Sequence, residues 1–246
     1  MELWQYGILV AAGMIGGTIN VMAGGGSILT VPVMIFLGLP GSVANGTNRI
    51  AVLAQDLTAL VTFYRRGWSN LRLSLSLAAC AFPGAMVGAW VGTSLSGELF
   101  NQILALVMLG VMILIFHGPK RSEDAVSSGR IKAGHALIAA AGFWGGFIQI
   151  GMGFIMMPIL NRVMGFDLVS ANVHKAFITA TYTIGALFIF AASGDIHWMI
   201  GAILAAGNAI GGYVGARLAI ARGEALIKRV LAVAIVVMII RLLIPA

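Results

Sequence analysis

The stretch GGTINVMAGGGSILTVP, residues 16–32, breaks an apolar run with three consecutive glycines, Gly24, Gly25 and Gly26. Glycine is a poor helix residue, and a helix broken inside lipid needs other partners for the backbone groups that it frees. The apolar segment after the break, 27–38, is too short to cross a hydrocarbon core of about 30 Å as a helix. We therefore predict a glycine-broken helical hairpin inside a membrane.

The bulk composition agrees with a membrane location. Of the 246 residues, 60% are hydrophobic and 9% are charged, with a mean hydropathy of +1.00. A soluble domain carries about 25% charged residues. Cys80 is the single cysteine and the histidines are scattered, so we expect no metal site, no cofactor and no catalytic residues. The sequence predicts an all-α polytopic membrane protein that is not an enzyme.

The second part of the chain repeats the first. GGFIQIGMGFIMMP, residues 145–158, echoes the first break and leads into another short segment, 154–164. GAMVGAWVG, residues 84–92, matches GNAIGGYVG, residues 207–215, and both place glycines four apart on one helix face. We predict a first transmembrane repeat at 1–117, a polar cytoplasmic linker at 118–132 and a second transmembrane repeat at 133–246.

Lysine and arginine predict how the two repeats are oriented. They gather in 65–72, 118–132 and 217–229, whereas the turns 95–99 and 193–197 contain none. The positive-inside rule places the basic stretches in the cytoplasm and leaves both chain termini outside. The turn 65–72 and its repeat partner 193–197 then lie on opposite sides. We predict two inverted repeats of about five helical elements each, an arrangement typical of secondary transporters.

The glycine breaks are the first candidates for chemistry. A helix that begins after a break offers N–H donors and the positive end of its dipole, which together attract anions. The alternative is a hairpin tip or packing kink without a ligand. The candidate substrate-binding residues are the backbone at Gly24, Gly25, Gly26, Ser27, Gly151 and Gly153, with the amides of Asn20 and Gln149 just before each break.

The helix after each short segment is unusually polar. VANGTNRIAV, residues 43–52, pairs with SANVHKAFIT, residues 170–179, and each brings one cation, Arg49 or Lys175. Polar groups inside a membrane must face protein or water, so a contact with an anionic substrate is one interpretation. The alternatives are an Arg49–Asp56 ion pair and a Lys175 side chain reaching the interface. The further substrate-binding candidates here are Asn45, Asn48, Asn172 and His174.

Asp56 is the only acid well inside a predicted span. A protonatable or cation-binding carboxylate there would couple transport to H⁺ or Na⁺, and the alternative is a buried counter-ion for Arg49.

The motifs INVMAGGGSILTVP, ANGTN and GFIQIGMGFIMMP resemble the two signatures of the sulfite exporter TauE/SafE family, also called the toluene-sulfonate uptake permease family. Family members usually have glycine at two positions of the second signature where this chain has Gln149 and Met152. The resemblance covers nearly the whole chain. It implies a multi-pass transporter of the bacterial or archaeal inner membrane that moves sulfite, a sulfonate or a related organosulfur anion or carboxylate.

We therefore expect a secondary transporter of a small anion that works by alternating access. Its partners would be the anion, the lipid bilayer and H⁺ or Na⁺, with no nucleic acid. A passive anion channel and an intramembrane enzyme are the alternatives.

Overall fold

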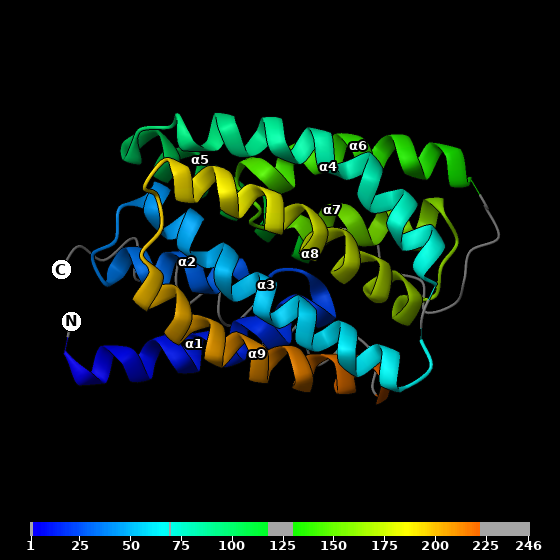
Figure 1. Ribbon diagram of the computed structural model, residues 1–246, viewed down its shortest axis with the longest axis horizontal. Helices are drawn as coiled ribbons and strands as arrows, with labels where there is room; N and C mark the ends of the chain where they lie inside the picture. The colour runs from blue at the N-terminus through cyan, green and yellow to red at the C-terminus, as the bar shows by residue number, and fades with distance from the viewer. Residues whose placement is uncertain (1, 69, 118–129, 222–246) are drawn as a thin grey trace.

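The protein is an elongated bundle of helices in the computed structural model, which describes residues 2–68, 70–117 and 130–221 (Figure 1). The described residues form no strand. The helices are α1 (Leu3–Ala23), α2 (Ser27–Phe36), α3 (Gly41–Arg65), α4 (Leu71–Thr93), α5 (Gly97–His117), α6 (Ile131–Phe147), α7 (Met152–Pro158), which continues as a π-helical segment (Ile159–Val163), α8 (Leu168–Ala192) and α9 (Trp198–Ala221). Most of the predicted linker, and the predicted segment 222–243 with its basic residues, lie outside the described residues.

Both predicted glycine breaks are confirmed. Helix α1 ends where Gly24 takes a left-handed conformation with φ 81°, and α2 begins three residues later. Helix α6 ends at Phe147, and the chain turns through positive φ values at Gln149 (59°) and Gly151 (73°) before α7. Glycine adopts φ > 0 without strain, which explains the turns at Gly24 and Gly151, whereas Gln149 takes a positive φ as a non-glycine residue.

The segments after the breaks are half-length helices. Helix α2 has 10 residues, which is about 15 Å of helix rise, half of a hydrocarbon core of about 30 Å. Helix α7 has 7 residues and ends at Pro158, where the missing N–H interrupts the regular hydrogen-bond ladder and a π-helical turn follows. Neither helix is long enough to span a bilayer by itself.

Four of the described helices, α1, α4, α8 and α9, are long and apolar enough to cross a membrane. They expose large apolar side chains such as Trp90, Leu75 and Phe188 on the outside of the bundle. Because such side chains are favourable in lipid, the exposed surface suits a multi-pass membrane protein.

The glycine stripes of α4 and α9 pack helices together closely, as the sequence predicts. A Cβ atom placed on Gly84 would lie 2.8 Å from the carbonyl oxygen of Ala139 in α6. One placed on Gly215 would lie 2.8 Å from the carbonyl oxygen of Thr18 in α1. Only glycine permits this backbone approach. These close contacts, of α4 with α6 and of α1 with α9, both join the first part of the chain to the second.

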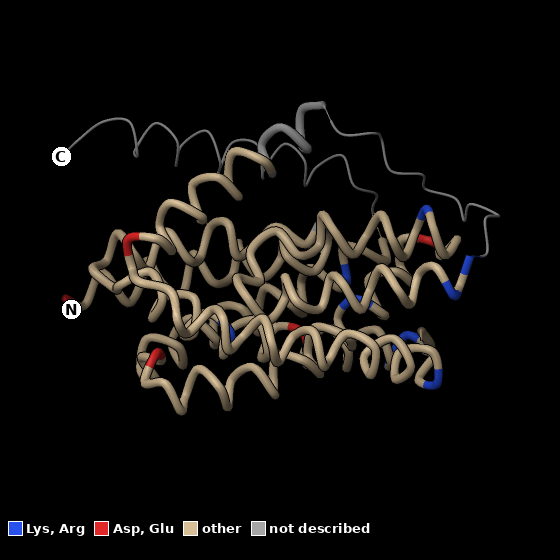
Figure 2. The backbone as a smooth tube through the Cα atoms, turned by 90° about the horizontal axis from the view of Figure 1, so that it is seen from above, with Lys and Arg blue, Asp and Glu red and all other residues tan. Residues whose placement is uncertain are grey.

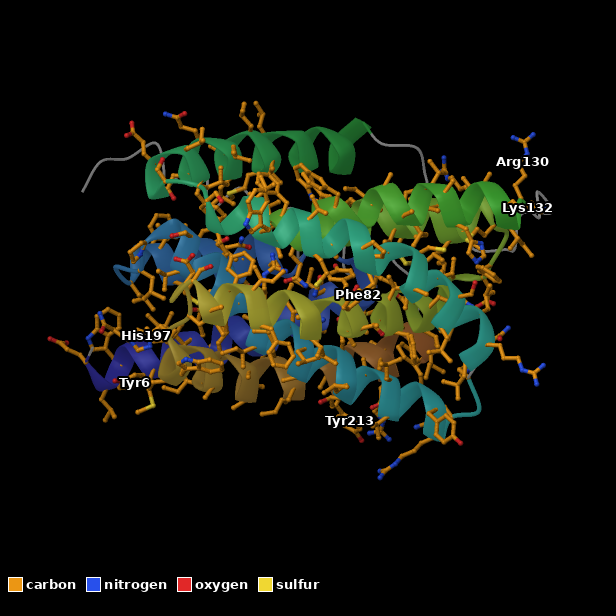
Figure 3. The ribbon with its side chains drawn as sticks, turned by 45° about the horizontal axis from the view of Figure 1, so that its top comes forward. Tyr6, Phe82, Arg130, Lys132, His197 and Tyr213 are labelled. Carbon is orange, nitrogen blue, oxygen red and sulfur yellow. The ribbon has the colours of Figure 1, made fainter. Side chains whose placement is uncertain are left out.

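The bundle has one basic end. Arg130 and Lys132, at the start of α6, lie at that end, whereas Tyr6 in α1 and His197 before α9 lie at the other (Figure 3). Most of the described lysines and arginines gather at the basic end, and only a few charges lie in the middle of the bundle (Figure 2). The α1–α2 and α6–α7 hairpins consequently enter the bundle from opposite ends.

Candidate functional site

The tips of the two glycine-broken hairpins touch in the middle of the bundle. The N–H of Gly153, at the start of α7, donates a hydrogen bond to the carbonyl oxygen of Gly24, at the end of α1, over 3.1 Å. A Cβ atom on Gly24 would lie 2.8 Å from the nitrogen of Gly153. Two segments far apart in the sequence therefore meet backbone to backbone, where only glycine fits.

Lys175 holds the helix end before the first break. Its ammonium donates to the carbonyl oxygens of Asn20 and Val21, each at 2.8 Å, and to the Oδ1 of Asn172 at 2.9 Å. The last carbonyls of a helix have no partner within the helix and carry the negative end of its dipole. Lys175 is 5% exposed, so its ammonium lies inside the bundle rather than at its surface.

Arg49 does the same for the second break. Its guanidinium donates to the carbonyl oxygens of Gly145, at 3.1 Å, and Gly146, both in the last turn of α6. It also lies over the ring of Phe190, 4.3 Å from the ring centre. Arg49 is fully buried, and these carbonyls rather than the carboxylate of Asp56 are its hydrogen-bond partners.

The two cations brace the two hairpins in a reciprocal way. Arg49, from α3, caps the helix before the second break, and Lys175, from α8, caps the helix before the first. The sequence repeat aligns Lys175 with Asn48 and not with Arg49, so the equivalence of the two cations is a property of the tertiary structure. Each hairpin is held by the polar helix from the other part of the chain.

The predicted amides Asn48 and Asn45 bind the helix start after the first break and the helix end before the second. Asn48 donates to the Oγ of Ser27 at 3.0 Å and accepts from the Oγ1 of Thr30 at 2.6 Å, which ties α3 to the first turn of α2. Asn45 donates to the carbonyl oxygen of Phe147 at 3.0 Å. The N–H groups of Ile28, Leu29 and Thr30, in the first turn of α2, donate to the carbonyl oxygens of Gly25 and Gly26, so these three donors are satisfied within the protein.

A chain of side chains leads from the first break to Asp56. Asn20 donates to the Oε1 of Gln55 at 3.2 Å, and Gln55 donates to the Oδ1 of Asp56 at 2.9 Å. The second oxygen of Asp56 is buried without a hydrogen-bond partner among the described residues. Lys175 is near enough to act electrostatically on this carboxylate.

At the second break, Gln149 donates to the Oγ1 of Thr183 at 2.9 Å. Its own Oε1 and the Nε of Arg49 are buried and have no hydrogen-bond partner within the described part of the chain. An acceptor and a charged donor are therefore left unused beside the break, and each such group has a desolvation cost of about 1–3 kcal/mol.

His174 is the candidate that the structure places elsewhere. Its Nδ1 lies 2.8 Å from the Oγ of Ser74 in α4, and its ring packs 4.8 Å from that of Phe166. The other predicted site residues take part in the hydrogen bonds given above and lie at or near the two breaks. Gly151 lies in the turn of the second break, where it has a φ of 73°.

Several residues at the site are absent from the sequence-based set of binding candidates. They are Thr30, Gln55, Thr183 and Phe190. When the pairing of residues 43–52 with 170–179 is continued along the two helices, Phe63 matches Phe190, which was a usable signal. The threonines gave none, because a helix threonine by default bonds back to its own helix, as Thr58 does to Ala54.

The buried charges near the breaks do not balance. Among the described residues, the buried side chains that carry a full charge are Arg49, Lys175 and Asp56. Two cations against one carboxylate leave a net positive charge in the interior. Burying a net charge is costly, so this centre is electrostatically suited to an anion.

Comparison with known proteins identifies the family of the chain. The family described as "Sulfite exporter TauE/SafE" matches residues 9–242. The chain is 29% identical to "Probable membrane transporter protein ORF9" of Sinorhizobium sp, over 96% of this chain and 91% of that protein. It is 28% identical to "Probable membrane transporter protein YfcA" of Escherichia coli (strain K12), over 96% and 89% of the two chains.

A relative from Haemophilus influenzae, "Probable membrane transporter protein", is 27% identical over 90% of this chain and 88% of its own length. No solved structure is significantly similar to the chain. Since the family match covers nearly the whole sequence, from the first helix past the last described one, the chain belongs to the sulfite exporter TauE/SafE family of membrane transporters.

Proposed function

We propose that the protein is a secondary transporter of a small anion, with sulfite, sulfonates and related organosulfur compounds as the substrate class. The observation that carries this proposal is the net positive charge of the buried centre beside the hairpin tips, where Arg49 and Lys175 stand against the single buried carboxylate of Asp56 among the described residues. The relatives' names state transport without a substrate, so the substrate class rests on the family description and on this charge.

The substrate would bind where the two tips meet. In the present conformation Gly153 donates to Gly24, and both cations donate to helix carbonyls, so the site is closed by contacts within the protein. An anion is a stronger acceptor for a guanidinium or ammonium than a neutral carbonyl. When the tips separate, the anion would take over these donors.

We further propose that the two halves are inverted repeats that work by alternating access. The opposite entry of the two hairpins and the reciprocal capping by Arg49 and Lys175 support this arrangement, because movement of either hairpin opens the site towards one end only. The protein would lie in the inner membrane, with the basic end of the bundle facing the cytoplasm.

Asp56 is the proposed coupling group. It links through Gln55 to Asn20 at the first break, and it has one unpartnered oxygen near Lys175. Binding of H⁺ or Na⁺ to this carboxylate would change the charge next to the substrate. Asp56→Asn should then abolish uptake that is driven by an ion gradient while it leaves counterflow exchange intact.

The decisive experiment is counterflow in proteoliposomes that contain purified protein and labelled sulfite, with taurine and acetate as competitors. Saturable exchange is expected, and Arg49→Gln and Lys175→Gln should each reduce it at least tenfold. The control variant is Lys132→Gln, which removes an exposed cation at the basic end. Conductance without saturation would identify a channel, and full exchange by both site variants would refute the cation site.

The inverted arrangement has a separate test. The test uses Asn70→Cys and Ser193→Cys, each in a Cys80→Ser background. The two positions lie in the turns that follow α3 and α8, and both are exposed. Labelling of intact cells with an impermeant maleimide should modify Ser193→Cys only. Modification of both from outside would contradict the inverted topology.

A further inference from the structure

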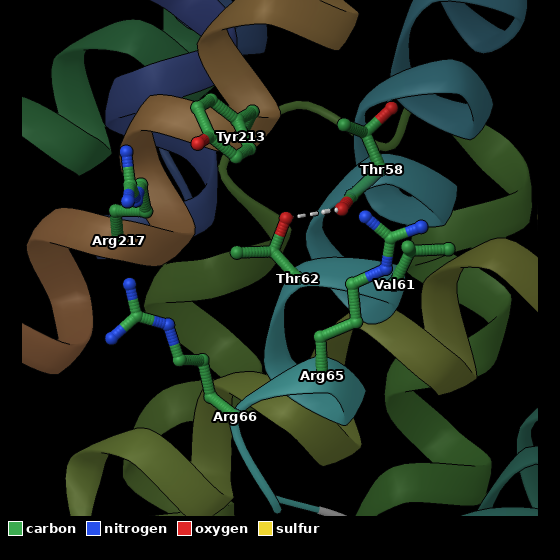
Figure 4. Close-up of a pocket in the computed structure, with 7 residues that line it drawn as sticks. All are labelled: Thr58, Val61, Thr62, Arg65, Arg66, Tyr213 and Arg217. Atoms are coloured by element: carbon green, nitrogen blue, oxygen red, sulfur yellow. Dashed lines mark hydrogen bonds between the residues drawn. The ribbon is translucent and has the colours of Figure 1, made fainter.

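A pocket rich in arginine lies away from the hairpin tips, between the ends of α3 and α9 (Figure 4). It has a volume of about 300 Å³. Three guanidinium groups line it, those of Arg65, Arg66 and Arg217, together with Thr58, Thr62 and Tyr213. Because α3 ends at Arg65, the pocket lies where the helices reach the basic end of the bundle.

The described lining of this pocket is positively charged. None of the described residues that line it is acidic. The Arg217 guanidinium lies over the ring of Tyr213, 5.0 Å from its centre, which holds the cation in place without neutralising it. Thr62 donates back to the carbonyl of Thr58 at 2.8 Å. Three arginines around one cavity form the kind of site that binds phosphate oxygens in bidentate fashion.

An apolar groove of about 390 Å³ adjoins this pocket. It is lined by Leu60, Trp68, Leu71 and Phe177, and it shares Val61 and Arg65 with the arginine pocket. Val61 is 52% exposed and Tyr64, also in the groove, is 66% exposed. The groove is therefore on the outer face of the bundle, where lipid would lie.

We propose that the arginine pocket and the adjoining groove together bind one anionic phospholipid. The phosphate would lie against Arg65, Arg66 and Arg217, and an acyl chain would pass Val61 into the groove. Basic pockets at helix ends bind the head groups of anionic lipids, and the acyl chain gains from burial on apolar side chains. A small transported anion would leave the apolar groove empty, whereas a phospholipid would fill both cavities. This proposal does not depend on the transport site.

The test uses the full chain in detergent, with native mass spectrometry and thermal shift against phosphatidylglycerol and phosphatidylcholine. Phosphatidylglycerol should bind preferentially. At roughly 1 kcal/mol for each arginine, Arg65→Gln alone should weaken binding about fivefold and the variant with all three arginines replaced about 100-fold. Val61→Trp, which keeps every charge but fills the junction, should also weaken binding.

The matched control is Arg72→Gln with Arg130→Gln, which removes two exposed arginines that begin α4 and precede α6 at the same end. It should retain the lipid preference. If this control loses as much phosphatidylglycerol binding as the pocket variants, the binding depends only on the total positive charge and the proposal is overturned. Equal binding of the two lipids would also overturn it. Inorganic phosphate or sulfite binding as tightly as the lipid, without any effect of Val61→Trp, would identify an anion site instead.

Discussion

Gly24 and Gly153 are in direct backbone contact, joined by a hydrogen bond of 3.1 Å from the N–H of Gly153 to the carbonyl oxygen of Gly24. These residues belong to breaks that are more than half the chain length apart. Their contact brings together the ends of α1 and the start of α7, and the capping cations Arg49 and Lys175 act on the helix ends beside it.

Gly24→Ala should destabilise the protein and impair transport. Gly67 has the same φ of 81° but has open space where a Cβ atom would go, whereas a Cβ atom on Gly24 meets the backbone of Gly153. Both variants carry the strain of a left-handed residue, about 1–2 kcal/mol, and only Gly24→Ala separates the tips. Thermal unfolding in detergent should show a clearly larger loss for Gly24→Ala. Equal losses would mean that the contact contributes nothing.

Arg49→Lys should fail to replace arginine. A single ammonium cannot reach several carbonyls in a plane and also lie flat over Phe190, as the guanidinium does. We expect a loss of about 1–3 kcal/mol in stability for Arg49→Lys and a larger loss for Arg49→Met, which leaves the carbonyls of α6 without a donor. Urea titration measures both. A fully stable Arg49→Met would show that the cap is dispensable for folding.

Replacing a glycine by alanine should change stability in opposite directions in α4 and in α5. Gly84→Ala places a methyl group against the α6 backbone, with 2.8 Å to the oxygen of Ala139, and should lower the unfolding temperature. Gly110→Ala, in α5, meets nothing within 4 Å and should raise stability by up to about 1 kcal/mol through helix propensity. If both substitutions stabilise the protein, α4 and α6 are not closely packed.

Asp195, in the turn between α8 and α9, gives a pH dependence. Partial burial raises the pKa of its carboxyl above the ordinary 3.8, and a hydrogen bond with Ser42 opposes this only in part. An acid with a raised pKa binds more protons when folded, so its contribution to stability is present below pH 3.8 and is lost as pH rises through the folded pKa.

The unfolding temperature of the wild type relative to Asp195→Asn should therefore fall as pH rises from about 3.5 to 6. The effect is small, because the side chain is largely solvated. A difference that stays constant over this range, or grows with pH, would contradict the assignment.

The sequence by itself determined the membrane class, the two breaks and the polar helices that follow them. Apolar composition and glycine spacing act locally, since a run of apolar residues favours helix in lipid and three glycines end it wherever the run folds. The glycine stripes of α4 and α9 could be recognised from the sequence for the same reason, although the sequence did not predict which helices they would contact.

The tertiary structure alone decided what the polar residues do. The sequence offered Asp56 as the partner of Arg49 and the interface as the destination of Lys175, because both are short-range possibilities. In the fold, Arg49 and Lys175 instead donate to carbonyl oxygens in the last turns of α6 and α1. These carbonyls lack partners within their own helices, so buried cations satisfy them. Such pairings depend on which helix ends meet, and that is set by packing across the whole chain.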